Sequence, residues 1–264
     1  MSKFKTIIFS DIDGIIWPEI NTLFALAGKL FPSQRKLLKV ENFTTITGKT
    51  EQNTPPLLLS HMLNKIFRIY EKLRIFQYPL EELENTMNKH FGPGIKINVH
   101  GSTDRIKSLK KLSKKNNVNL EFITRRYNYQ NVSNIQADTK RFNSHYGLPL
   151  QIHFSNKKFS KGHIINKIRA KKENSKIKQV IILEDNLAEI LKIRTELKKQ
   201  NLTTKFFLIR YPWNSITKKN IQELKTFIKP LGLKLIKTTP SLLVLKDSKP
   251  LTIYLIDKIS EISI

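Results

Sequence analysis

The sequence predicts an α/β fold in which a parallel β-sheet is covered by helices on both faces, with a helical segment inserted after the first strand. Two observations predict the sheet. Short apolar segments alternate with helical patterns, and the clearest of these segments are apolar at almost every position, as in strands buried on both faces. A third observation predicts the insert, because about a hundred residues separate the first predicted strand from the second.

Five strands are predicted, each from a short run of aliphatic and aromatic residues. They are KTIIFS (5–10), LEFIT (120–124), LQIHF (150–154), QVIILE (179–184) and KFFLIR (205–210). Apolar residues at helical spacing predict a helix before the second strand and one after each of the second to fifth strands. These helices cover residues 104–116, 128–146, 161–173, 187–200 and 216–229.

The interval after the first strand is mainly helical. Helical patterns cover residues 18–31, 55–73 and 79–91. The turn-forming sequence FGPG (91–94) ends this run. We therefore assign residues 17–95 to a helical insert, and residues 1–16 and 96–264 to the core domain. Residues 231–264 are expected to form two short strands followed by a final strand or helix.

The composition excludes several classes of site. The chain has 264 residues and no cysteine, which rules out disulfides, thiolate metal sites and cysteine nucleophiles. The absence of cysteine is consistent with a reducing cytoplasm, where we expect the protein to work. The most apolar helical stretch (55–70) contains basic and polar residues, so no membrane span is expected. The apolar run near Met1 is too short for a secretory signal.

The formal net charge of +26 has two interpretations. Basic runs at 107–115, 157–172 and 191–200 are compatible with nucleic-acid binding. However, these runs lie on helical stretches whose opposite face is apolar, which is typical of solvated helix faces, and lysine, isoleucine and asparagine are frequent throughout the chain. We favour the second interpretation and keep nucleic acid as an alternative partner. The charge attracts anionic ligands of any size.

Reactive or ion-binding side chains lie at or after the ends of four predicted strands. In chain order they are Asp11, Asp13, Thr124, Lys161, Glu184 and Asp185. Ligands of open α/β sheets bind beyond the carboxyl ends of the strands, so these side chains are expected to lie close together. Each residue type is common at such a position. Their order at four successive strand ends carries the prediction.

This set contains the groups that phosphoryl transfer requires. Clustered carboxylates hold Mg²⁺ through oxygen, together with a substrate phosphate. One carboxylate can act as a nucleophile and form an aspartyl-phosphate, and a second can act as acid and then base. A hydroxyl group and a lysine can hold the phosphoryl oxygens, where negative charge accumulates. The sequence therefore predicts a phosphoryl-transfer site at one edge of the sheet.

Four segments resemble the motifs of the haloacid dehalogenase-like (HAD) hydrolase superfamily. They are DIDG (11–14), LEFIT (120–124), FSKG (159–162) and IILED (181–185). The resemblance covers about residues 1–16 and 96–211, and it implies a Rossmann-like fold and Mg²⁺-dependent phosphoryl transfer. The helical insert lies where some members of that family carry a C1 cap.

The resemblance also implies roles for single residues. Asp11 is expected to be the nucleophile, and Asp13 to protonate the leaving oxygen and then activate water. Thr124 and Lys161 are expected to bind the phosphoryl group. An aspartate at position 13 favours a phosphatase over a dehalogenase, because cleavage of a carbon–halogen bond needs no proton for the leaving group.

The resemblance implies a Mg²⁺ site as well. Its expected ligands are Asp11, the backbone carbonyl of Asp13, and Asp185. Glu184 is the expected fourth contact, and Glu189, four residues after Asp185, is a less favoured alternative.

The substrate is expected to be a small phosphorylated metabolite. The sequence RYPWN (210–214) is similar to a turn of nucleotidase-like members, which points to a nucleoside monophosphate. For these residues we favour a plain turn before a helix, with Asn214 or Ser215 as the helix cap. For Trp17 we favour packing at the entry to the insert over contact with substrate. Two other functions stay open: a phosphatase acting on nucleic-acid ends, and a non-catalytic RNA-binding protein on the same scaffold.

Overall fold

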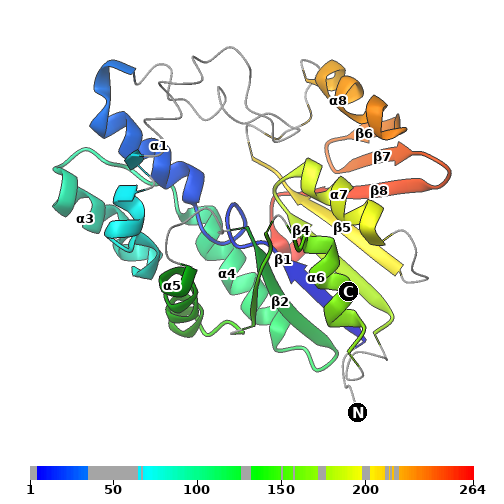
Figure 1. The fold of residues 1–264 in the computed structure, drawn as a ribbon, viewed down its shortest axis with the longest axis horizontal. Helices are drawn as coiled ribbons and strands as arrows, with labels where there is room; N and C mark the ends of the chain where they lie inside the picture. Colours follow the sequence, from blue (N-terminus) through cyan, green and yellow to red (C-terminus); the bar gives the residue numbers. More distant parts are fainter. Residues whose placement is uncertain are drawn as a thin grey trace.

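The structure is a computed structural model that describes most of the chain. It describes residues 5–34, 65–66, 68–125, 132–149, 151–156, 158–171, 177–197, 203–211, 214, 216 and 220–264. Within these residues, helices cover an eight-stranded sheet (Figure 1). The predicted α/β class is therefore confirmed. None of the helices in this part of the chain is both long enough and apolar enough to cross a membrane.

The sheet is mostly parallel, with strands in the order β3-β2-β1-β4-β5-β8-β7-β6. The strands are β1 (Thr6–Ser10), β2 (Val118–Thr124), β3 (Ile152–Phe154), β4 (Gln179–Glu184), β5 (Thr203–Ile209), β6 (Lys234–Thr239), β7 (Leu242–Lys246) and β8 (Pro250–Ile256). The first six strands in this order pair in parallel, and β8, β7 and β6 form an antiparallel meander. The strand order reverses direction at β1, and such a point is where open α/β sheets bind ligands.

All five strands predicted from apolar runs are present. The strand β4 has the predicted bounds, and β3 is shorter than expected. The C-terminal segment forms the two expected short strands, β6 and β7, and the strand β8 and a short 3₁₀ turn follow them. This last strand pairs in parallel with β5 and so extends the parallel part of the sheet.

The helices also follow the predicted order. They are α1 (Glu19–Leu30), α3 (Leu80–Phe91), α4 (His100–Ser113), α5 (Val132–Tyr146), α6 (Lys161–Arg169), α7 (Leu187–Leu197) and α8 (Ile221–Ile228). Short 3₁₀ turns are η1 (Pro32–Gln34), η3 (Ile75–Gln77), η6 (Lys229–Leu231) and η7 (Ile259–Glu261). Of the helix expected at 55–73, residues 65–66 and 68–72 are helical, and residues 55–64 and 67 lie outside the described residues.

The two faces of the sheet carry separate hydrophobic clusters. Ile8 of β1 packs in the cluster that contains Leu109 of α4, whereas its neighbours Ile7 and Phe9 pack in the cluster that contains Ile165 of α6. This alternation follows from the two-residue period of a strand. Because both faces are covered, every residue of β1 is buried, which explains why Ile7, Ile8 and Phe9 are apolar in succession.

The helical insert shares one hydrophobic cluster with the sheet. Trp17, at the start of the insert, is fully buried. Its ring packs edge-on against Phe76 of η3 at 4.4 Å and against Phe142 of α5 at 5.6 Å between ring centroids. Its Nε1 donates a hydrogen bond to the hydroxyl of Tyr70. Trp17 therefore packs at the entry to the insert, which is the role that we favoured for it over contact with substrate.

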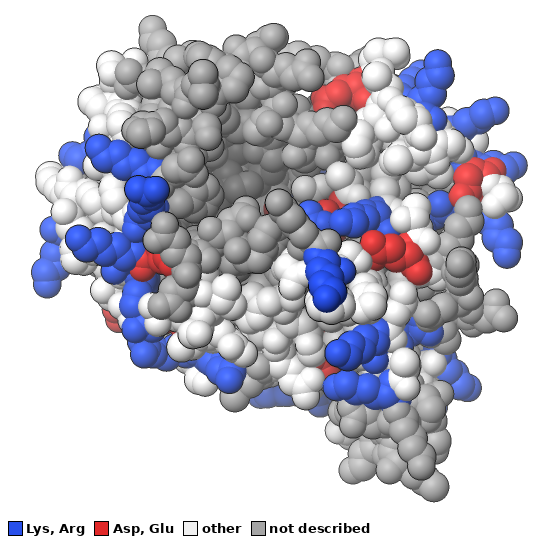
Figure 2. Space-filling view, viewed as in Figure 1, with Lys and Arg blue, Asp and Glu red and all other residues white. Residues whose placement is uncertain are grey.

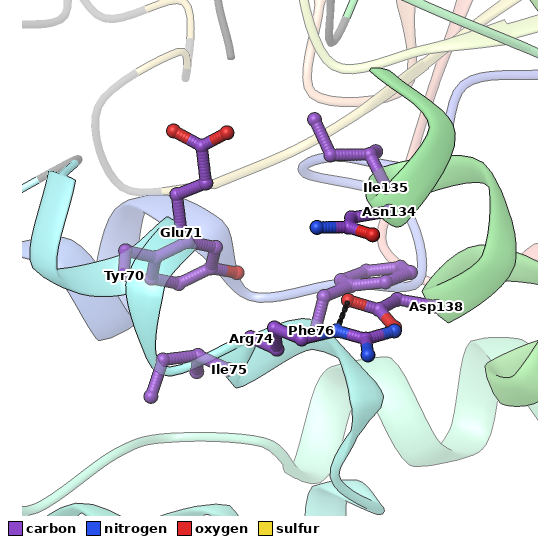
Figure 3. A pocket seen from close by; sticks show the side chains of 8 residues that line it. All are labelled: Tyr70, Glu71, Arg74, Ile75, Phe76, Asn134, Ile135 and Asp138. Atoms are coloured by element: carbon purple, nitrogen blue, oxygen red, sulfur yellow. Dashed lines mark hydrogen bonds and ion pairs between the residues drawn. The ribbon is translucent and has the colours of Figure 1, made fainter. Parts of the chain in front are cut away.

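The segment that contains η3 lies beside α5 (Figure 1), and polar side chains join the two. Arg74 forms a two-pronged ion pair with Asp138, in which Arg74 Nε lies 3.2 Å from Asp138 Oδ2 (Figure 3). A cavity of about 20 Å³ lies beside this pair, between the 70–76 segment and α5. Tyr146 of α5 accepts a hydrogen bond from the backbone of Leu80 and donates one to Glu81, both at 2.7 Å. The division of the chain into a core and a cap stays a prediction.

Candidate active site

The loop that follows β1 carries the first two candidate residues. Asp11 continues the pairing of β1, since its backbone N–H donates to the carbonyl of Leu183 in β4. The chain then turns tightly around Ile12, whose carbonyl accepts hydrogen bonds from the N–H groups of residues 15–17. Gly14 has a φ of +76°, a conformation that favours glycine. The turn places Asp11 and Asp13 at the carboxyl end of β1.

Lys161 lies between two carboxylates that come from different strands. Its Nζ is 2.5 Å from Asp11 Oδ2 and 2.6 Å from Glu184 Oε1. Lys161 is the first residue of α6, and Ser160 caps that helix by accepting a hydrogen bond from the backbone of His163. The side chains of Lys161 and Glu184 are each 2% exposed. Such deep burial of charges requires the close pairing that is observed.

Burial and neighbouring charges shift the pKa values of these groups. Burial alone would lower the pKa of Lys161, but the charges of Asp11 and Glu184 outweigh it and raise this pKa above its usual value. Lys161 is therefore a cation at neutral pH. Burial, reinforced by the negative charge of Asp11, raises the pKa of Asp185 to about 7.

Three carboxylates converge in a way that suits a hard divalent cation. One oxygen each of Asp11, Glu184 and Asp185 lies within 4.8 Å of the others. Glu184 Oε2 is buried and has no hydrogen-bond partner among the described residues. A Cβ atom on Gly14 would lie 1.8 Å from Asp185 Oδ2, so the loop approaches this carboxylate as closely as only glycine permits. Oxygen ligands of this type are the ones that Mg²⁺ prefers, so these residues fit the expected ion.

The structure brings Thr124 and Asp13 together. Thr124 is the last residue of β2 and is fully buried. Its hydroxyl Oγ1 donates to Asp13 Oδ2 at 3.2 Å. The side chain of Asp13 thus points toward the end of β2, and it is not part of the carboxylate cluster of Asp11, Glu184 and Asp185.

Glu189, the alternative ligand, lies apart from that cluster. It is in the first turn of α7, and its Oε1 is 2.7 Å from the guanidinium of Arg125, which directly follows Thr124. Among the described acidic residues, Glu184 rather than Glu189 therefore joins Asp11 and Asp185.

Sequence reasoning missed a buried polar network next to this cluster. Arg105 of α4 donates to the carbonyl oxygens of Gly14 and Ile15, both at 3.4 Å, and to the hydroxyl of Tyr211. The Tyr211 hydroxyl in turn donates to the carbonyl of Gly14. Burial raises the pKa of Tyr211 to about 12, so this hydroxyl stays protonated at neutral pH. In the sequence, Arg105 is one more basic residue on a basic helix, and nothing local distinguishes it.

The expected role of Asn214 as a helix cap is wrong. The helix α8 begins only at Ile221. Asn214 is buried instead, and its Nδ2 donates to the carbonyl of Asp185 at 2.8 Å and to that of Ile209 at 2.7 Å. The Asn214 side chain thus satisfies backbone carbonyls of two separate segments, in keeping with the rule that buried polar groups are hydrogen-bonded. Ser215, the other proposed cap, lies outside the described residues.

No protein-family model matches the chain, and no curated protein matches it at a significant level. Any function assigned to the chain therefore depends on its own residues and their geometry.

Proposed function

We propose that the chain is a Mg²⁺-dependent phosphomonoester hydrolase that works through an aspartyl-phosphate intermediate. We further propose that its core is HAD-like and that residues 17–95 are its C1 cap. One observation carries the proposal: Asp11, Lys161, Glu184 and Asp185 come from three separate segments and meet at one edge of the sheet. A structural ion pair would need only one of these carboxylates beside Lys161.

The proposed reaction has two steps. In the first, a carboxylate oxygen of Asp11 attacks the phosphorus, the bond from phosphorus to the ester oxygen breaks, and Asp13 gives its proton to that oxygen. In the second, Asp13 takes a proton from a water molecule, the water oxygen attacks the same phosphorus, and the bond from phosphorus to the Asp11 oxygen breaks. Inorganic phosphate leaves, and Asp11 and Asp13 return to their starting states.

The surrounding residues support these steps. Lys161 holds a positive charge 2.5 Å from Asp11, which orients this nucleophile and stabilises charge on the phosphoryl group. The hydrogen bond from Thr124 orients the carboxyl group of Asp13. Mg²⁺ would be held by Asp11, Glu184, Asp185 and the carbonyl of Asp13, and when bound it neutralises charge on the phosphoryl oxygens.

The proposed substrates are small phosphate esters. A nucleoside monophosphate stays one candidate among them. The similarity that favoured it depends on the turn at Asn214, whose side chain is buried against Asp185 and Ile209 rather than directed outward. The turn therefore gives no support for a nucleoside over another leaving group.

Hydrolysis of p-nitrophenyl phosphate tests the proposal directly. The purified protein with Mg²⁺ should release p-nitrophenol, and Asp11→Asn should lower kcat by about 10³-fold or more, because the amide is a poor nucleophile. When wild-type protein is quenched during turnover of an ester labelled in its phosphoryl group, the label should be attached to the protein. Hydroxylamine should then remove it. Asp247→Asn, which removes a carboxylate at the β7–β8 turn, should keep its activity. Activity that survives Asp11→Asn would refute the mechanism.

A phosphatase acting on nucleic-acid ends is the second candidate, favoured by the net charge of +26. Figure 2 shows Lys and Arg side chains spread over the visible face rather than gathered in one patch, as expected for solvated helix faces. This candidate predicts turnover of phosphorylated oligonucleotides that falls steeply with salt concentration. Tight RNA binding without hydrolysis of any ester would instead favour a binding protein.

A further inference from the structure

We infer that Arg105, Tyr211 and Asn214 are positioning residues that hold the Asp13–Gly14 turn against Asp185. They would thereby set the distance between the proposed acid and base group and the carboxylates that hold the metal. This inference rests on the proposed function and names the residues on which its geometry depends.

Arg105 fixes the turn from the side of α4. It is 7% exposed, and in the described part of the chain its hydrogen-bond partners are neutral oxygens. Its Nε is buried with no hydrogen-bond partner among these residues. Burial of a guanidinium without a carboxylate partner is unfavourable for stability. We explain the burial of Arg105 by its hydrogen bonds, which hold the backbone of Gly14 and Ile15 in place.

Tyr211 fixes the same turn from the end of β5. Its hydroxyl donates to the carbonyl of Gly14 and accepts from Arg105. The guanidinium carbon of Arg105 also lies 4.7 Å from the centre of the Tyr211 ring. Two elements that are far apart in the sequence therefore converge on one carbonyl group, which restricts Gly14 from two directions.

Asn214 holds Asp185, the residue against which the Asp13–Gly14 turn lies. It is 2% exposed, and its amide group donates to the carbonyl of Asp185. Its Oδ1 accepts a hydrogen bond from the backbone of Tyr211 at 2.6 Å. Since Tyr211 and Asn214 are joined to each other, one short segment holds both Gly14 and Asp185.

The contact between Gly14 and Asp185 is tight enough to make this control matter. A Cβ atom on Gly14 would lie 1.8 Å from Asp185 Oδ2, so the backbone of Gly14 leaves no room for even a methyl group beside this carboxylate. Asp13 precedes Gly14 and moves with it. In catalytic sites, a displacement of about 1 Å can lower the rate by about 10²-fold.

The variant Tyr211→Phe tests the inference with the least disturbance, because it removes only the hydroxyl group. We expect kcat for p-nitrophenyl phosphate to fall about tenfold or more with KM nearly unchanged, since orientation rather than binding is affected. The affinity for Mn²⁺, measured by electron paramagnetic resonance in the absence of substrate, should fall several-fold. Arg105→Lys, which keeps the charge, should retain more activity than Arg105→Met.

The matched control is Tyr146→Phe, which removes a hydroxyl that binds Leu80 and Glu81 on the insert. It should lower the melting temperature but leave kcat and Mn²⁺ affinity unchanged. Equal effects of the two tyrosine variants on kcat would overturn the inference, and so would unchanged kcat and Mn²⁺ affinity in both Tyr211→Phe and Arg105→Met.

The proposed function can fail separately from the inference. A wild-type protein that binds Mn²⁺ but hydrolyses no ester refutes the phosphatase, and the effect of Tyr211→Phe on Mn²⁺ affinity still decides whether the network positions the carboxylates. A wild-type protein that shows neither property overturns both.

Discussion

Lys161 Nζ lies 2.5 Å from Asp11 Oδ2, although the two residues are 150 positions apart in the chain. The contact forms because α6 returns the chain from the edge strand β3 to β4, which lies beside β1. Lys161 at the start of this helix then lies at the carboxyl end of the sheet, where β1 ends in Asp11. The pairing of these residues organises the candidate site even before a ligand binds.

Replacing Lys161 with methionine should destabilise the fold. The change leaves Asp11 and Glu184 without their shared cation, and breaking a buried ion pair in this way lowers the free energy of unfolding by about 3–5 kcal/mol. Because the pKa of Lys161 is raised above 10.5, its contribution is fully present at neutral pH and is lost only as the pH rises through that higher value. Urea unfolding at pH 7 measures the loss.

Saturating Mg²⁺ provides the control for this prediction. If the carboxylates bind the ion, Mg²⁺ should stabilise Lys161→Met, because a ligand that binds only the folded state raises its stability. If Lys161→Met and the wild type are equally stable when both lack Mg²⁺, the predicted contribution of the buried ion pairs to stability is contradicted.

The raised pKa of Asp185 predicts that metal affinity depends on pH. With a pKa of about 7 in the metal-free protein, this carboxyl group must lose a proton before it can bind a cation. Affinity for Mg²⁺ should therefore be roughly tenfold weaker at pH 6 than at pH 8. Calorimetry in two buffers of different ionisation enthalpy should detect the released proton. Proton release that persists in Asp185→Asn would show that another group is responsible.

Gly14→Ala should disrupt the site through a collision. The added Cβ would lie 1.8 Å from Asp185 Oδ2, and φ at this position is +76°. We expect weaker Mn²⁺ binding and a lower melting temperature. Gly232→Ala is the matched control, because Gly232 has a φ of +69° and its added Cβ would meet nothing within 4 Å. That control should show only the conformational strain, roughly 1–2 kcal/mol, and normal Mn²⁺ binding.

Trp17→Phe should affect stability and leave substrate selection unchanged. The indole is fully buried and contacts Tyr70, Phe76 and Phe142, so its loss should lower the free energy of unfolding by about 1–3 kcal/mol. The ratio of kcat/KM for p-nitrophenyl phosphate to that for a small alkyl phosphate should stay the same. Phe142→Leu, in the same cluster, should behave alike. A changed ratio in Trp17→Phe alone would place the indole at the substrate.

The strands of the sheet could be predicted from the sequence where their burial makes a short run of consecutive residues apolar. The strands β1 and β4 lie at its centre, and because both faces are covered, their inner residues, IIF and VIIL, are all apolar. The partner of β8 could not be predicted, because the choice of β5 as its neighbour depends on contacts with a segment about fifty residues earlier, and its own alternating sequence is compatible with either strand direction.

The chemical groups at or just after the strand ends can be identified from the sequence alone: Asp11, Asp13, Thr124, Lys161 and the Glu184–Asp185 pair. Those positions follow from the local pattern of strands and helices, because a parallel sheet brings the carboxyl ends of its strands to one edge. Two features depend on the folded chain. Glu184 joins the carboxylate cluster while Glu189 pairs with Arg125. Arg105 binds the turn at Gly14, and Asn214 binds the backbone at Asp185. The physical reason is that these interactions join side chains to partners on distant segments, and such contacts leave no periodic pattern in the sequence.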